Sequence, residues 1–135
     1  NFLMEKKFLK KIIAQSPEDL QFISACCSEA KVKIKDIKYL SSHKIFLLSL
    51  SRFKKEKENG NKKINSIIKF DFIESSKAKN IEQNSPDLLL ELLAINLFKR
   101  KHNFEITLLF SNNRFITLVV ETIEAILEDQ KVIND

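Results

Sequence analysis

The stretch from Asn103 to Gln130 constrains the fold more than any other part of this chain. Apolar and polar residues alternate over residues 104–110, which is the period of a strand with one buried face. Asn112 and Asn113 then predict a tight turn. The strand that follows, over residues 115–121, is apolar at odd and even positions, so we expect cover on both of its faces. This stretch therefore predicts a β-hairpin around which the rest of the chain packs.

After Thr122 the spacing of apolar residues changes from two to that of a helix. The apolar positions are Ile123, Ile126 and Leu127. The acidic positions, which we expect to face solvent, are Glu124, Glu128 and Asp129. This pattern predicts a C-terminal amphipathic helix that follows the hairpin directly.

An earlier helix is predicted after a short first strand over residues 8–14. Ser16 is a typical N-cap, and Pro17 suits the first helical position, where its missing N–H costs nothing. The two carboxylates that follow lie at the positive end of the helix dipole. We expect this helix to end near Glu29.

The segment over residues 88–98 is apolar on every face, so periodicity alone leaves helix and strand open. We prefer a strand, because a compact polar turn at residues 99–103 leads into the next strand. Further strands are expected over residues 45–53 and from Ile64 onward.

These elements predict a single α+β domain over residues 1–135. Its antiparallel sheet would have about seven strands and be bent or partly closed into a barrel, with one helix after the first strand and one at the C-terminus. Strands followed by a terminal helix are typical of the pleckstrin-homology-like architecture, which we offer as an analogy.

The net charge of +5 is unevenly placed along the chain. Residues 1–63 carry 15 basic and 7 acidic groups, whereas residues 64–135 carry 8 basic and 11 acidic groups. Such asymmetry could steer an acidic partner, or let two copies meet head to tail. Lysine supplies 20 of the 23 basic residues, as an AT-rich coding sequence would also dictate.

Several lysines are candidate contacts for an anion or a partner. Lys31, Lys33 and Lys35 alternate with apolar residues, and form either a solvated or edge-protecting strand face or an anion-binding stripe. The polar loop at 54–63 is expected to be the exposed tip of a long hairpin. The full set of candidate contacts is Lys31, Lys33, Lys35, Arg52, Lys54, Lys55 and Lys57.

Arg52 is the most informative single charge. Strand alternation points it toward the core, where a guanidinium needs a carboxylate or several carbonyls to offset its desolvation. We expect a structural pair with Glu121 or Asp129. A core-facing Arg52 without a partner would instead indicate an anion site.

The residues that common catalytic and cofactor sites require are scarce. A single glycine excludes a glycine-rich phosphate loop. His43 and His102 lie in expected turns without ligands at metal spacing, and Cys26 and Cys27 are adjacent. We therefore expect no catalytic residues, no cofactor and no metal.

The chain resembles a family of small alphaproteobacterial proteins, the domain of unknown function family 2948. The segments that carry the resemblance are Glu18-Asp19-Leu20 with Ile23-Ser24, Ser51-Arg52-Phe53, Leu92-Leu93-Ala94-Ile95, the run from Leu108 to Ile116, the run from Glu121 to Ala125, and Leu127-Glu128-Asp129. This chain has Asn112-Asn113 where the family tends to have glycines, Thr122 in place of a Cys and Lys54 in place of a Trp. The resemblance implies a fold and an organism group, and no activity.

These observations favour a non-catalytic protein-interaction or ligand-binding module in the cytoplasm. A protein partner comes ahead of a small ligand, whose identity the sequence leaves open, and self-association is plausible. No apolar run has the roughly 18 residues of a membrane span, and no signal peptide is visible. The alternative is a nucleic-acid-associated protein with a lysine-rich face, and the third hypothesis is an enzyme of unknown class.

Overall fold

The computed structural model describes residues 10–54 and 62–132. In chain order the elements are β1 (Lys11–Ala14), α2 (Pro17–Cys27), β2 (Ala30–Lys33), the 3-10 turn η1 (Ile34–Asp36), β3 (Ile37–Leu40), the 3-10 turn η2 (Ser41–His43), β4 (Ile45–Phe53), β5 (Lys63–Phe70), β6 (Ile73–Lys79), β7 (Leu89–Lys99), β8 (Phe104–Phe110), β9 (Arg114–Val120) and β10 (Ala125–Val132).

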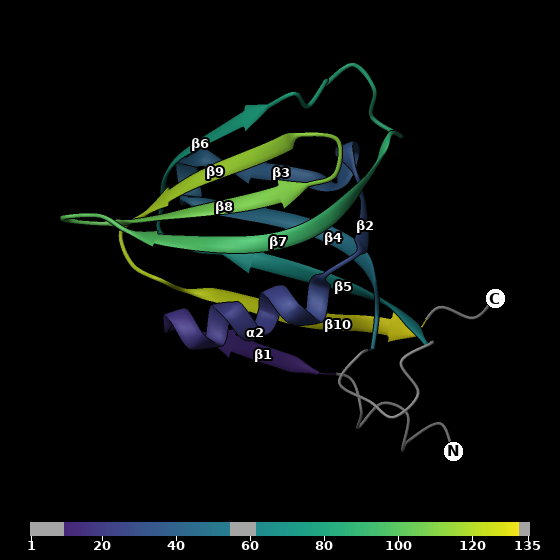
Figure 1. The fold of residues 1–135 in the computed structure, drawn as a ribbon, viewed down its shortest axis with the longest axis horizontal. Helices are drawn as coiled ribbons and strands as arrows, with labels where there is room; N and C mark the ends of the chain where they lie inside the picture. The colour runs from purple at the N-terminus through teal and green to yellow at the C-terminus, as the bar shows by residue number, and fades with distance from the viewer. Residues whose placement is uncertain (1–9, 55–61, 133–135) are drawn as a thin grey trace.

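All ten strands belong to one antiparallel sheet. Their order is β1-β10-β5-β4-β2-β7-β8-β9-β6, and β3 pairs with the first half of β4. The sheet is strongly curled, so that β6 to β9 lie above β4, β5 and β10 in Figure 1. Inward-facing residues of both groups form one hydrophobic core, which includes Leu48, Ile68, Leu108 and Leu118.

The curl brings β3 and β6 near each other without joining them. A backbone hydrogen bond of 2.9 Å from Ile73 N–H to the Lys44 carbonyl links the start of β6 to the turn before β4. Beyond it, Tyr39 of β3 and Ala78 of β6 line an opening of about 160 Å³. The sheet path is therefore open, and the expected partly closed barrel has no strand ladder that closes it.

Helix α2 confirms the predicted helix. The Ser16 side chain accepts a hydrogen bond of 3.2 Å from the Asp19 N–H, Pro17 is the first helical residue, and the first turn is acidic. Its buried face consists of Leu20, Ile23, Cys26 and Cys27. In Figure 1 the helix crosses the front of the sheet between β7 and β1, where it covers part of the core.

Strand β7 confirms the strand prediction for the apolar segment at residues 88–98. Its buried residues, among them Leu90, Leu92 and Ile95, face the core, and a bulge between Leu92 and Ala94 shifts the alternation. The Ile95 N–H donates to the Ser24 side chain of α2 at 2.8 Å, which fixes the helix against this strand.

The central hairpin forms as predicted, with β8 and β9 paired from Phe104 to Val120. Asn112 and Asn113 have φ angles of 62° and 59°. Asparagine tolerates this left-handed region better than other residues with a Cβ, which is why it substitutes for glycine in such turns.

The predicted C-terminal helix is wrong, because residues 125–132 form strand β10 between β1 and β5. Ile123, Ala125, Leu127 and Asp129 are buried at alternate positions, which is the period of a strand. The helix interpretation required Asp129 in solvent, whereas Asp129 is 5% exposed. Because residues 125–132 form a strand, the described part of the chain has no terminal helix, which is the feature on which the pleckstrin-homology-like analogy depended.

The strand count is also higher than the expected seven. The structure adds β3 and β6 to the expected strands, whereas β2 is the strand that the alternation at residues 31–35 predicts. It also adds β10 in place of the terminal helix. These three strands account for the larger sheet.

Candidate functional site

Arg52 and Asp129 form a buried ion pair inside the sheet. The Arg52 Nη2 atom lies 3.0 Å from Asp129 Oδ1 and 3.2 Å from Oδ2, and both side chains are inaccessible to solvent. Ser66 lies on β5, between the strands that carry the pair, and is the register partner of Asp129. Its hydroxyl accepts from Arg52 Nε at 3.2 Å and donates to Asp129 Oδ1 at 2.7 Å.

Backbone groups complete this network. The Lys10 N–H donates to Asp129 Oδ2 at 3.1 Å, and Arg52 Nη1 donates to the Phe53 carbonyl at 3.3 Å. Among the described residues, no buried side-chain nitrogen or oxygen lacks a hydrogen-bond partner. The network links Arg52 of β4, Ser66 of β5 and Asp129 of β10 with Lys10, the residue before β1, and Asp129 compensates the Arg52 charge.

Glu121, the other carboxylate considered for Arg52, lies elsewhere. It is about half exposed and pairs with Lys44 at 3.3 Å. That surface pair contributes little to stability, because two exposed charges are screened by water.

The lysine stripe at residues 31–35 is divided between two elements. Lys31 and Lys33 lie on β2, whereas Lys35 lies on the turn η1. Because β2 pairs with β4 on one side and β7 on the other, it is not an edge strand. Lys31 forms an ion pair of 3.2 Å with Glu91, and Lys35 one of 2.9 Å with Asp87.

The Lys35–Asp87 ion pair changes the pKa values of its two side chains in opposite directions. The hydrogen bond to Lys35 lowers the pKa of Asp87 below its usual value, and the hydrogen bond to Asp87 raises the pKa of Lys35. We expect Asp87 to stay ionised to lower pH than an unpaired aspartate, with any stabilisation present above the ordinary aspartate pKa and lost as pH falls through the lowered one. A carboxyl NMR titration measures this, and Lys35→Met should return the Asp87 midpoint to the ordinary range.

An open groove of about 390 Å³ lies on the outer surface of the sheet beside the two β2 lysines. Residues from β2, β4, β5 and β10 line it, and the polar ones include Lys31, Lys33, Ser51, Asn65 and Gln130. Its lining combines amines, hydroxyls and amides with the Asp36 carboxylate, all of which can form hydrogen bonds with a small polar molecule.

Lys54, a further predicted contact, does not line this groove. Lys54 is 5% exposed. Its backbone N–H donates a hydrogen bond of 2.8 Å to the Lys62 carbonyl, which links the end of β4 to the start of β5. Lys55 and Lys57 lie outside the described residues.

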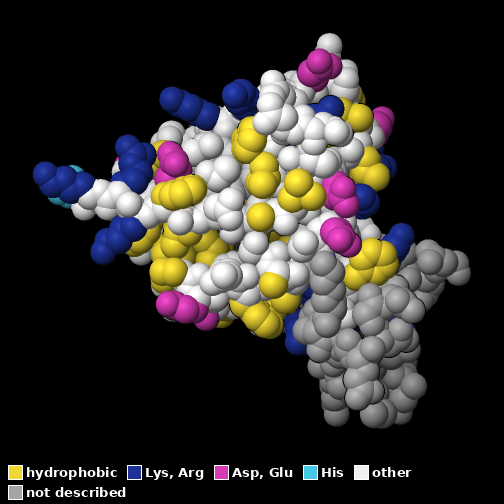
Figure 2. All heavy atoms as spheres, viewed as in Figure 1, with side chains coloured by type: hydrophobic (Ala, Val, Ile, Leu, Met, Phe, Trp, Pro, Cys, Tyr) yellow, Lys and Arg dark blue, Asp and Glu magenta, His cyan; other side chains and the backbone are white. Residues whose placement is uncertain are grey.

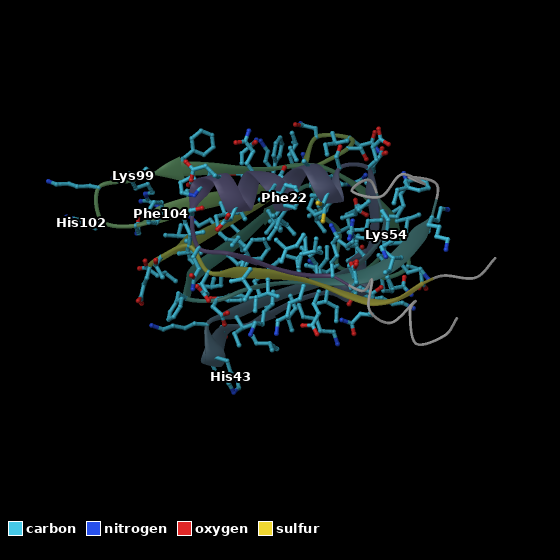
Figure 3. The ribbon with its side chains drawn as sticks, turned by 90° about the horizontal axis from the view of Figure 1, so that it is seen from below. Phe22, His43, Lys54, Lys99, His102 and Phe104 are labelled. Atoms are coloured by element: carbon cyan, nitrogen blue, oxygen red, sulfur yellow. The ribbon has the colours of Figure 1, made fainter. Side chains whose placement is uncertain are left out.

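The described residues contain no group of three histidine, cysteine, aspartate or glutamate side chains that could hold a metal ion. Figure 3 shows His43 and His102 at separate ends of the molecule. Cys26 and Cys27 are both buried and not disulfide-bonded.

The outer surface of β7, β8 and β9 carries a group of apolar residues, called here the apolar face. It consists of Leu93, Phe98, Leu109, Phe115 and Val119, of which Phe98 is 56% and Leu93 is 40% exposed. Cross-strand register places Leu109 beside Phe115. Figure 2 shows hydrophobic side chains spread over this side of the molecule.

The turn between β7 and β8 carries a basic cluster that the sequence analysis treated only as a polar turn. Lys99, Arg100 and Lys101 are consecutive and exposed, and His102 follows them. The sequence itself signals this cluster, because Lys99–His102 consists of three cationic residues followed by a histidine. In Figure 3 Lys99 and Phe104 lie at the base of this turn and His102 at its outer end.

The model of the family described as protein of unknown function DUF2948 matches residues 10–133. This match covers nearly the whole chain. The chain belongs to the DUF2948 family. No curated protein and no solved structure matches it.

DUF2948 membership agrees with the segments that carried the resemblance, which lie on α2, β4, β7, the β8–β9 hairpin and β10 with the turn before it. The family description assigns no activity, so any function for this DUF2948 chain rests on its own surfaces. No helix in the described ranges is long and apolar enough to cross a membrane.

Proposed function

We propose that this chain is a non-catalytic, cytoplasmic protein-interaction module whose partner docks on the apolar face. The observation that carries the proposal is that β9 has apolar residues on its outward side as well as on its core-facing side. A strand with apolar residues at odd and even positions is typical of cover on both sides. Within the described ranges, the elements with extensive contacts to β9 are its sheet neighbours β8 and β6, and its outward residues Phe115, Thr117 and Val119 remain partly exposed.

The composition of the apolar face supports a protein partner. Outward positions on β8 and β9 are Glu105, Thr107, Leu109, Phe115, Thr117 and Val119, of which only Glu105 is charged. Depletion of charge together with exposed aromatic and aliphatic side chains is typical of the centre of protein interfaces. Exposed apolar patches on soluble domains mark such sites.

Two buried cysteines without a disulfide bond are compatible with the cytoplasmic part of the proposal. Cys26 and Cys27 are not disulfide-bonded, as is usual for thiols in a reducing compartment.

The test compares proteins retained from nuclease-treated lysate by three immobilised forms of the chain. They are the wild type, the Leu93→Asp/Phe98→Asp double variant, and the control Ile13→Asp, whose side chain on β1 is 51% exposed. We expect the wild type and the control to retain one and the same protein at low and at moderate salt. The double variant should retain about tenfold less of it or lower, because a carboxylate at the centre of an interface must be removed from water. Mass spectrometry quantifies it.

Equal recovery on all three forms, or no protein retained at moderate salt, would contradict the proposal. Sedimentation velocity of the purified chain tests whether the chain associates with itself. If the wild type dimerises and the double variant does not, the partner on the apolar face is a second copy of this chain.

A further inference from the structure

We propose that the turn between β7 and β8 binds the phosphate backbone of duplex nucleic acid, a function beyond the protein docking proposed above. Lys99, Arg100 and Lys101 present three positive charges in succession there, and all three are exposed. We call these three residues the basic tip. Neutralising phosphates with such side chains releases counterions, which drives binding without sequence specificity.

The basic tip is closed at its base by backbone pairing and projects from the molecule. The Arg100 N–H donates to the Asn103 carbonyl at 2.9 Å, and Lys99 pairs in register with Phe104, so the turn is closed at its base. Figure 1 shows the β7–β8 turn extending beyond the rest of the sheet. A two-stranded ribbon of this kind fits the major groove of B-form DNA, which is about 12 Å wide.

The charge of the basic tip is not offset by the protein itself. In the described part of the chain no carboxylate forms an ion pair with Lys99, Arg100 or Lys101. By contrast, Lys31 and Lys35 are paired with Glu91 and Asp87. Among the described residues the stripe thus keeps one lysine without an ion pair, Lys33, whereas all three residues of the basic tip lack one.

The composition of the turn favours phosphate over other acidic partners. Residues 99–103 include no apolar side chain. A protein interface requires an apolar centre, and a membrane-surface segment requires apolar side chains that insert among the lipids. Phosphate binding requires only accessible positive charge.

The experiment measures fluorescence anisotropy of a labelled duplex of about 20 base pairs with the full chain. We expect affinity to fall about 40-fold between roughly 50 and 200 mM salt, the slope for three phosphate contacts. The variant K99A/R100A/K101A should bind at least about tenfold more weakly at the lower salt. The control K31A/K33A/K35A removes the same charge and should stay within about threefold of wild type.

Equal losses in the two triple variants would assign binding to net charge and overturn the proposal. Absence of duplex binding by the wild type at the lower salt would overturn it as well. So would tighter binding to phosphatidylglycerol vesicles, or to polyglutamate, that depends on the same three residues. Circular dichroism establishes that the tip variant keeps its fold, which is expected because all three side chains are exposed.

Discussion

Replacing Asp129 by alanine is expected to lower the free energy of unfolding by about 3–5 kcal/mol, because it leaves the Arg52 guanidinium buried without its carboxylate. Arg52 is 1% exposed and reaches Asp129 through two contacts of 3.0 and 3.2 Å. The same change removes the acceptor for the Ser66 hydroxyl and the Lys10 N–H. Urea unfolding followed by circular dichroism measures the loss.

Two control variants distinguish the effect of breaking the buried ion pair from the effect of removing a charged side chain. In Arg52→Met/Asp129→Leu both charges are gone, and we expect most of the stability to return, since apolar residues of similar volume often replace a buried pair at little cost. Glu121→Ala removes an exposed partner of Lys44 and should change stability by less than about 1 kcal/mol. A loss at Asp129→Ala as small as at Glu121→Ala would show that Asp129 is not buried against Arg52.

The C-terminal segment shows what the sequence could and could not decide. Ile123, Ile126 and Leu127 fit helical spacing, while Ile123, Ala125 and Leu127 fit a strand equally well. Two predictions about Asp129 conflicted, since a solvent-facing helical aspartate could not also partner a core-facing Arg52. Had the pair been given priority, Asp129 would have faced the core and the strand period would have followed.

The candidate sites depended on contacts between distant segments. Lys31 and Glu91 are register partners on β2 and β7, and the hydrogen bond between Lys35 and Asp87 is likewise tertiary. Sequence alone could therefore not tell which lysines keep an uncompensated charge. Helix α2, strand β4 and the central hairpin were predictable because capping residues, alternation and turn residues are local signals.

Phe70→Ala is expected to lower the free energy of unfolding by about 3–5 kcal/mol, the cost of emptying an aromatic site in a packed core. Phe70 is fully buried on β5, beside Phe46 on one neighbouring strand and Ala125 on the other. The centroids of the Phe46 and Phe70 rings lie 6.4 Å apart. Because Ala125 and its partner Ala14 are both small, we expect the neighbours of Phe70 to fill little of the space that its ring leaves.

Phe98→Ala is the matched control, since it removes the same atoms from a side chain that is 56% exposed on the apolar face. Little apolar area returns to water there, so its loss should stay below about 1 kcal/mol in the isolated chain. Chemical denaturation of both variants measures the difference. If both losses were large, the ring of Phe98 would be covered in the free protein, which would contradict the availability of the apolar face for a partner. If both losses were small, the position of Phe70 as a core residue would be contradicted.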